Sequence, residues 1–250
     1  MAFMRRYKLD ILIIALFICY ILLSHFTTNN KTLELLLRIP ITVLIVWLIT
    51  KRVNLHNIFG PTVHLKLGQM ILFILLSIYL FGLILLHADN LVLVGELPWQ
   101  RMLQVITAAI LAGVFEEYFC RGYLFGSILR WQNQQSFRLT IAAFGSALIF
   151  GCTHFNNFIV GAGSFTAVTQ QVFYATCIGI VFAAIRVGSK GLTMGVLAHI
   201  IIDLQPQLLE TNHQSGPWLA VFIIFLPVAV ISLSYFIWLD QTTKKQTICV

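Results

Sequence analysis

The chain has 250 residues, of which 59% are hydrophobic and 10% are charged, and its mean hydropathy is +0.89. Soluble domains carry about 25% charged residues, so this composition excludes a water-soluble globular enzyme, and it equally excludes a disordered protein. The net charge of +7 comes mainly from basic residues that flank apolar runs. This pattern is typical of membrane orientation and does not indicate nucleic-acid binding.

Apolar runs follow one another along the whole chain, and each approaches the twenty or so residues that a transmembrane helix needs. They predict an all-α membrane bundle of about eight transmembrane helices that forms a single domain over residues 1–250. No small-residue cleavage site follows the first run, so we expect it to be a retained span and not a signal peptide. The predicted spans are Leu9–Phe26, Leu33–Thr50, Leu67–Leu86, Met102–Leu129, Leu139–Phe155, Thr166–Val187, Gly191–Leu209 and Trp218–Leu239.

Basic residues alternate between the two sets of span ends. One set carries only Lys31 and Arg101. Because cytoplasmic loops are rich in Lys and Arg, we expect the other set, and with it both termini, to lie in the cytoplasm. That set comprises Arg5, Arg6, Lys8, Lys51, Arg52, Lys66, Arg130, Arg138, Arg186, Lys190, Lys244 and Lys245.

Ionisable residues inside the predicted spans are the candidates for function, because each is costly in the membrane. Glu34 and Arg38 lie four residues apart near the outer end of the second span, where a local ion pair explains them. The other six lie in the fourth, fifth and seventh spans. They are Glu116, Glu117, Arg121, His154, His199 and Asp203.

Helical spacing separates the roles of the two adjacent glutamates. Side chains of neighbouring residues point about 100° apart on an α-helix, and Glu117 can pair with Arg121 four residues later. Glu116 is then left free for chemistry. At a rise of about 1.5 Å per residue, Glu116, His154 and His199 lie roughly 21, 22 and 13 Å from the basic ends of their spans. A common polar site near the middle of the membrane follows.

Three short motifs resemble those of the CPBP family, the CaaX-protease and bacteriocin-processing intramembrane proteases, also called the Abi family. Glu116-Glu117-Tyr118-Phe119-Cys120-Arg121 resembles its E-E-x-x-x-R motif, Phe150 to His154 its F-x-x-x-H motif, and His199 to Asp203 its H-x-x-x-N/D motif. The three occur in the family's order, on separate spans, within a protease-like core over residues 102–209.

The resemblance implies an intramembrane endopeptidase similar to CaaX prenyl protease type 2. It implies that Glu116 activates water, that His154 assists, that His199 and Asp203 line the opposite wall, and that Arg121 supports the acidic pair. A bacterial plasma membrane is the expected location, with a role in bacteriocin self-immunity or peptide processing. The expected partners are membrane lipids and a peptide or membrane-protein substrate.

Two ways of stabilising the oxyanion remain open. A divalent metal such as zinc could be held by Glu116, His154, His199 and Asp203 with an open water position. Alternatively, third-motif side chains donate hydrogen bonds directly. Many relatives have Asn where this chain has Asp203, and Asp donates only when protonated, so Asp203 favours the metal.

Two other classes of function fit the same buried residues. Intramembrane Glu, His and Arg also serve proton-coupled transporters, although the chain has neither an internal repeat nor paired Gly- or Pro-broken helices. A non-catalytic membrane scaffold or immunity factor with a protease-like fold is the third possibility. Cleavage of a candidate peptide separates the enzyme from both.

Overall fold

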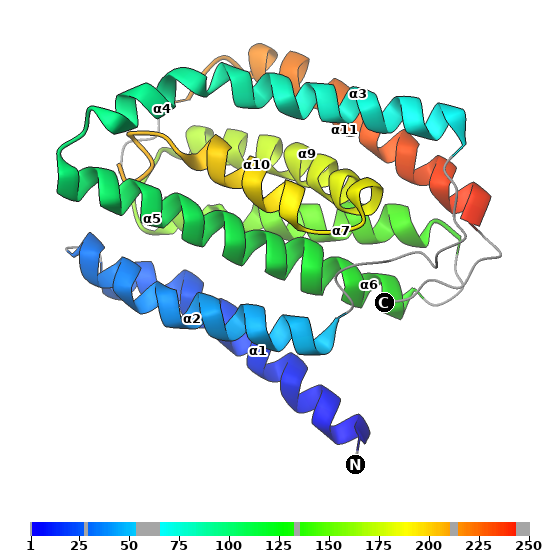
Figure 1. The fold of residues 1–250 in the computed structure, drawn as a ribbon, viewed down its shortest axis with the longest axis horizontal. Helices are drawn as coiled ribbons and strands as arrows, with labels where there is room; N and C mark the ends of the chain where they lie inside the picture. The colour runs from blue at the N-terminus through cyan, green and yellow to red at the C-terminus, as the bar shows by residue number, and fades with distance from the viewer. Residues whose placement is uncertain (1, 28–29, 54–65, 133–135, 211–214, 244–250) are drawn as a thin grey trace.

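The computed structural model describes residues 2–27, 30–53, 66–132, 136–210 and 215–243. Within these ranges every regular element is a helix, so the predicted all-α class is confirmed. The helices lie side by side and roughly antiparallel in one bundle (Figure 1). They are α1 (Ala2–Phe26), α2 (Lys31–Arg52), α3 (Leu67–Leu86), α4 (Ala88–Gly95), α5 (Trp99–Glu116), η1 (Glu117–Leu124), α6 (Phe125–Trp131), α7 (Arg138–Thr153), α8 (Phe155–Ile159), α9 (Phe165–Ser189), α10 (Thr193–Asp203) and α11 (Trp218–Thr243).

Seven stretches of the described chain are long and apolar enough to cross a membrane, so the protein is a multi-pass membrane protein. The longest combines α5, η1 and α6 into one continuous run. The seven are Lys8–Phe26, Lys31–Arg52, Leu67–Gly95, Trp99–Trp131, Arg138–Ile159, Phe165–Ser189 and Trp218–Thr242.

The seventh predicted span is longer than the helix found in the structure. We expected a helix over Gly191–Leu209, but α10 covers only Thr193–Asp203, 11 residues. A helix of that length rises about 17 Å, well short of the ~30 Å hydrocarbon core of a membrane. Pro206 disfavours helix in the residue before it, and the chain continues as a turn over residues 206–209. The polar end of α10, Asp203, therefore stops inside the bundle.

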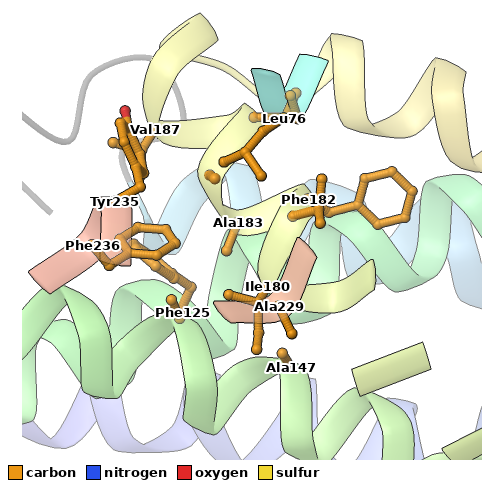
Figure 2. Close-up of a cluster of buried hydrophobic side chains, with 14 of the residues drawn as sticks. Leu76, Phe125, Ala147, Ile180, Phe182, Ala183, Val187, Ala229, Tyr235 and Phe236 are labelled. Carbon is orange, nitrogen blue, oxygen red and sulfur yellow. The ribbon is translucent and has the colours of Figure 1, made fainter. Parts of the chain in front are cut away.

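The main core lies where α9 packs between α7 and α11. Figure 2 shows its side chains from five elements, with Leu76 of α3 and Phe125 of α6 meeting α9 and α11. Small residues on the facing helices, such as Ala147 and Ala183, are fully buried and let the backbones approach closely. α9 is thereby held at the centre of the bundle, next to the motif-bearing helices.

The chain directions place most of the basic span ends at one end of the bundle. α1, α3, α7 and α10 begin there, and α2, α6, α9 and α11 end there, on the right in Figure 1. We call this the basic end. That it faces the cytoplasm stays a prediction, and Lys244 and Lys245 lie outside the described residues.

Arg186 corrects one expectation about these charges. We placed it among the residues facing the cytoplasm, but it lies on α9 before the helix end and is only 2% exposed. Its Nη1 donates to the carbonyl of Gly122, at 3.2 Å, and its guanidinium lies over the ring of Phe125. These contacts enclose the cation in the core, although α9 ends at Ser189, only two residues beyond the predicted span.

α10 packs closely on α5 at Gly113. A Cβ added at Gly113 would come within 3.0 Å of the backbone nitrogen of Ile200 and would collide with the Ile200 side chain. We expect Gly113→Ala to lower the free energy of unfolding by about 1–3 kcal/mol, as overpacked cores do. Gly82→Ala on α3 is the control, because nothing lies within 4 Å of a Cβ there. Equal thermal unfolding temperatures of the two variants would contradict this tight contact.

Candidate active site

The first motif lies in a widened stretch of helix. Glu116 ends α5, and η1, an eight-residue π-helix, carries Glu117 and Arg121. In a π-helix each amide bonds the carbonyl five residues earlier, and such segments occur frequently at functional sites. Apolar periodicity predicted one α-helix through this region and gave no sign of the change. The wider turn brings residues four apart nearly above one another, as Glu117 and Arg121 are.

Glu117 is the centre of a buried charge network. Its Oε1 accepts from Nη1 of Arg121 at 2.7 Å and from Nδ1 of His199 at 3.0 Å. Glu117 and Arg121 are 1% and 0% exposed, so the predicted pair is present and enclosed. The contact with His199 joins the first motif to the third across 82 residues of sequence. Because Glu117 already accepts two charge-assisted bonds, it is not free to act on a substrate.

Aromatic rings fix the orientation of these groups. Phe182 of α9 lies parallel to the imidazole of His199 at a centroid distance of 5.2 Å, and Phe150 meets the same imidazole edge-on at 5.8 Å. The guanidinium of Arg121 lies over the rings of both, at 4.3 Å from Phe150 and 5.2 Å from Phe182. Phe150 belongs to the second motif, whereas no motif marks Phe182.

His199 presents its second nitrogen to two carboxylates. Nε2 is 3.5 Å from Oε2 of Glu116 and 3.5 Å from Oδ2 of Asp203. Both distances exceed an ordinary hydrogen bond of 2.7–3.2 Å, so these are ion-pair contacts with room for movement. The side chains of Glu116 and Asp203 are 26% and 25% exposed, against 1% for Glu117. Glu116 is therefore the accessible member of the acidic pair.

His154 is held by a local bond at the end of α7. Its Nδ1 lies 3.1 Å from the carbonyl oxygen of Phe150, one turn earlier. A carbonyl can only accept, so Nδ1 carries the proton, and Nε2 of the neutral ring is left as an acceptor. The Phe150 ring meets the imidazole edge-on at 5.1 Å.

The free groups of all three motifs face one cavity of about 340 Å³. Glu116, His154, His199 and Asp203 line it together, as their positions in the spans predicted. Glu34 and Arg38, which we interpreted as a local pair, also line it. That pair is present at 2.8 Å, and Lys31 joins Glu34 at 3.1 Å. Their place in the cavity wall depends on how α2 packs against α5. The spacing of the apolar runs in the sequence does not predict this packing.

The arrangement of these donors gives no support to the expected metal site. Among the described residues, no three His, Cys, Asp or Glu side chains come together in a group that could hold an ion. No step below is therefore routed through a metal.

Comparison with known proteins agrees with the motifs. The family model for Rce1-like proteins, described as type II CAAX prenyl endopeptidase Rce1-like, matches residues 98–205. The matched range begins just before α5, ends just after α10 and contains all three motifs, which confirms the resemblance drawn from them. No curated protein and no solved structure gives a significant match.

Proposed function

Because residues 98–205 match the family model for Rce1-like type II CAAX prenyl endopeptidases, we propose that the chain is an intramembrane endopeptidase in which Glu116 is the general base. The observation that carries the proposal is the inequality of the two adjacent glutamates. Glu117 is buried and bonded to Arg121 and His199, whereas Glu116 faces the cavity with no bonded cation nearer than 3.5 Å among the described residues.

The hydrolysis uses water that enters the cavity. Glu116 takes a proton from the water while the water oxygen bonds to the carbonyl carbon of the scissile peptide. The electron pair of the carbonyl double bond moves to its oxygen. When the C–N bond breaks, the pair returns to re-form the carbonyl, and Glu116 gives its proton to the leaving nitrogen. The products are one carboxyl group and one amine.

The two histidines serve this reaction differently. Nε2 of His154, without a proton, is placed to accept a hydrogen bond from the attacking water. His199 has its Nδ1–H fixed on Glu117, in the way a carboxylate orients the histidine of a catalytic triad. Its protonated Nε2 then donates to the oxyanion. A donor held in place beforehand contributes about 3–4 kcal/mol to such a transition state.

Asp203 tests whether the oxyanion is stabilised without a metal. We expect wild-type cleavage to be insensitive to a chelator, and Asp203→Asn to retain activity within about tenfold, because the amide keeps the shape and supplies a donor. The measurement is cleavage of membrane-anchored peptides by the purified protein in vesicles, followed by mass spectrometry. Chelator-sensitive wild type with an Asn variant rescued by added metal would establish the metal mechanism instead.

We propose the biological setting as well. We place the protein in a bacterial plasma membrane, with bacteriocin self-immunity or peptide processing as its role. A neighbouring gene for a short secreted peptide would support this assignment. If the wild-type protein protects cells and cleaves nothing, the non-catalytic immunity factor takes the place of the enzyme.

A further inference from the structure

One buried cation has no part in the hydrolysis proposed above. Arg186 of α9 is 2% exposed, and within the described part of the chain no ion pair joins it to a carboxylate. Its Nε and Nη2 make no hydrogen bond there either. It is not among the residues that line the cavity, so it does not touch a substrate. Burying a charge without a countercharge is strongly unfavourable, and the bond that Arg186 does make therefore calls for an explanation.

That bond goes to the last turn of η1. Nη1 of Arg186 donates to the carbonyl oxygen of Gly122 at 3.2 Å, and the guanidinium lies over the ring of Phe125, 5.4 Å from its centroid. The amide of Phe125 still bonds five residues back, to the carbonyl of Cys120. Where a π-helix returns to α-helical bonding, the acceptor changes from five residues earlier to four, so one carbonyl is left without an amide donor. Gly122 lies at this changeover, and Arg186 supplies a charged donor there.

The same face of α9 contacts the charge network of the site. Gly179, Phe182 and Arg186 stand at positions i, i+3 and i+7, which share one face of a helix. A Cβ at Gly179 would lie 2.9 Å from Nη2 of Arg121, so this glycine leaves room for the guanidinium. Phe182 packs against both Arg121 and His199. α9 therefore touches η1 at Arg121 and again one residue further on.

From these contacts we propose that Arg186 is a positioning residue of the active site. By bonding the carbonyl at the end of η1, it keeps this segment in its π-helical winding and fixed against α9. η1 carries Glu117 and Arg121, and Glu117 orients His199 through Nδ1. Arg186 thus acts on His199 through the backbone of η1. Its effect on cleavage rests on the proposed endopeptidase function, whereas its effect on η1 does not.

Arg186→Met tests the proposal by removing the charge and the donor at similar length. An apolar side chain in place of a buried, unpaired cation does not lower stability, so we expect a folded protein that unfolds no earlier than wild type. Its kcat should fall by about 10–100-fold, as when a reacting group is displaced by about 1 Å. KM should stay within about twofold, because Arg186 makes no contact with the substrate.

Arg101→Met is the matched control. It is the same substitution in the first turn of α5, outside the cavity. This variant should keep the wild-type kcat and KM in the cleavage of membrane-anchored peptides in vesicles.

Hydrogen exchange of the backbone amides, followed by mass spectrometry, measures the effect on η1 directly. Arg186→Met should exchange faster in peptides that cover residues 117–125 and at the wild-type rate in peptides from α3. A general loss of stability would raise exchange throughout the chain. Wild-type kcat, or wild-type exchange at η1, in the folded variant would overturn the proposal. If wild-type protein cleaves nothing, the endopeptidase function fails, and exchange at η1 alone decides whether Arg186 holds this segment.

If Arg186→Met does not fold, Arg186→Lys decides. Lysine keeps the charge but has no planar group that can lie over Phe125 while it bonds Gly122. We therefore expect a folded protein with faster exchange at η1 and a lower kcat at unchanged KM. Wild-type kcat and wild-type exchange in this variant would leave Arg186 with a general structural role and overturn the proposal.

Discussion

Glu116→Gln abolishes peptide cleavage and leaves the protein folded. Glutamine keeps the shape and the hydrogen-bonding oxygen of the side chain but cannot take a proton from water. General bases contribute about 10²–10⁴-fold to a rate, so we expect at least that loss in kcat. Glu116 is partly exposed to the cavity and lies only at ion-pair distance from His199, so little stability depends on its charge.

The measurement compares cleavage rates and thermal unfolding of the same preparations. Glu96→Gln is the matched control. It is the same glutamate-to-glutamine substitution, but it lies outside the cavity, at the end of α4. The control should cleave at the wild-type rate. A Glu116→Gln protein that keeps a tenth or more of the activity would remove Glu116 from the role of base.

Glu117→Gln is expected to act mainly on stability, whereas Glu116→Gln acts mainly on activity. The substitution leaves the guanidinium of Arg121, which is fully buried, without a carboxylate, and it also removes the anion that holds Nδ1 of His199. Breaking a buried pair by removing one partner costs about 3–5 kcal/mol. We expect a loss of that size in the free energy of unfolding, and reduced activity in whatever fraction stays folded.

A similar pair elsewhere provides the control. Glu34 and Arg38 have the same i,i+4 spacing at 2.8 Å, but the side chain of Arg38 is 22% exposed and lines the cavity, so Glu34→Gln should cost less stability than Glu117→Gln. The double change Glu117→Gln with Arg121→Met should recover part of the stability, since it removes the stranded charge. If Glu117→Gln unfolds like wild type while abolishing cleavage, Glu117 has a direct chemical role instead.

Much of the site followed from local spacing in the sequence. The pairing of Glu117 with Arg121 needs only residues four apart on one turn, and that pair is present. The meeting of Glu116, His154, His199 and Asp203 in one cavity follows from similar depths in neighbouring spans. These features depend on helical rise and hydropathy, both of which are properties of short segments.

What the sequence did not predict depends on contacts between distant helices. The bond from His199 to Glu117 and the packing of Phe182 on His199 require α10 and α9 to be placed against η1. The burial of Arg186 results from its contacts with Gly122 of η1 and Phe125 of α6. Hydropathy also overestimated α10, because the residues after Asp203 are apolar enough for a span although Pro206 disfavours continuing the helix.

The π-helix makes the length of this segment matter as much as its side chains. A π-helix holds more residues per turn than an α-helix, so loss of one residue between Glu117 and Leu124 would return this stretch to the narrower α-helical winding. Side chains within the stretch would then point in other directions, and Glu117 would lose its present geometry towards Arg121 and His199. Point substitutions alter one contact at a time, but a deletion here breaks several together. The number of residues in η1 is thus a structural requirement of its own, separate from the identity of the residues within it.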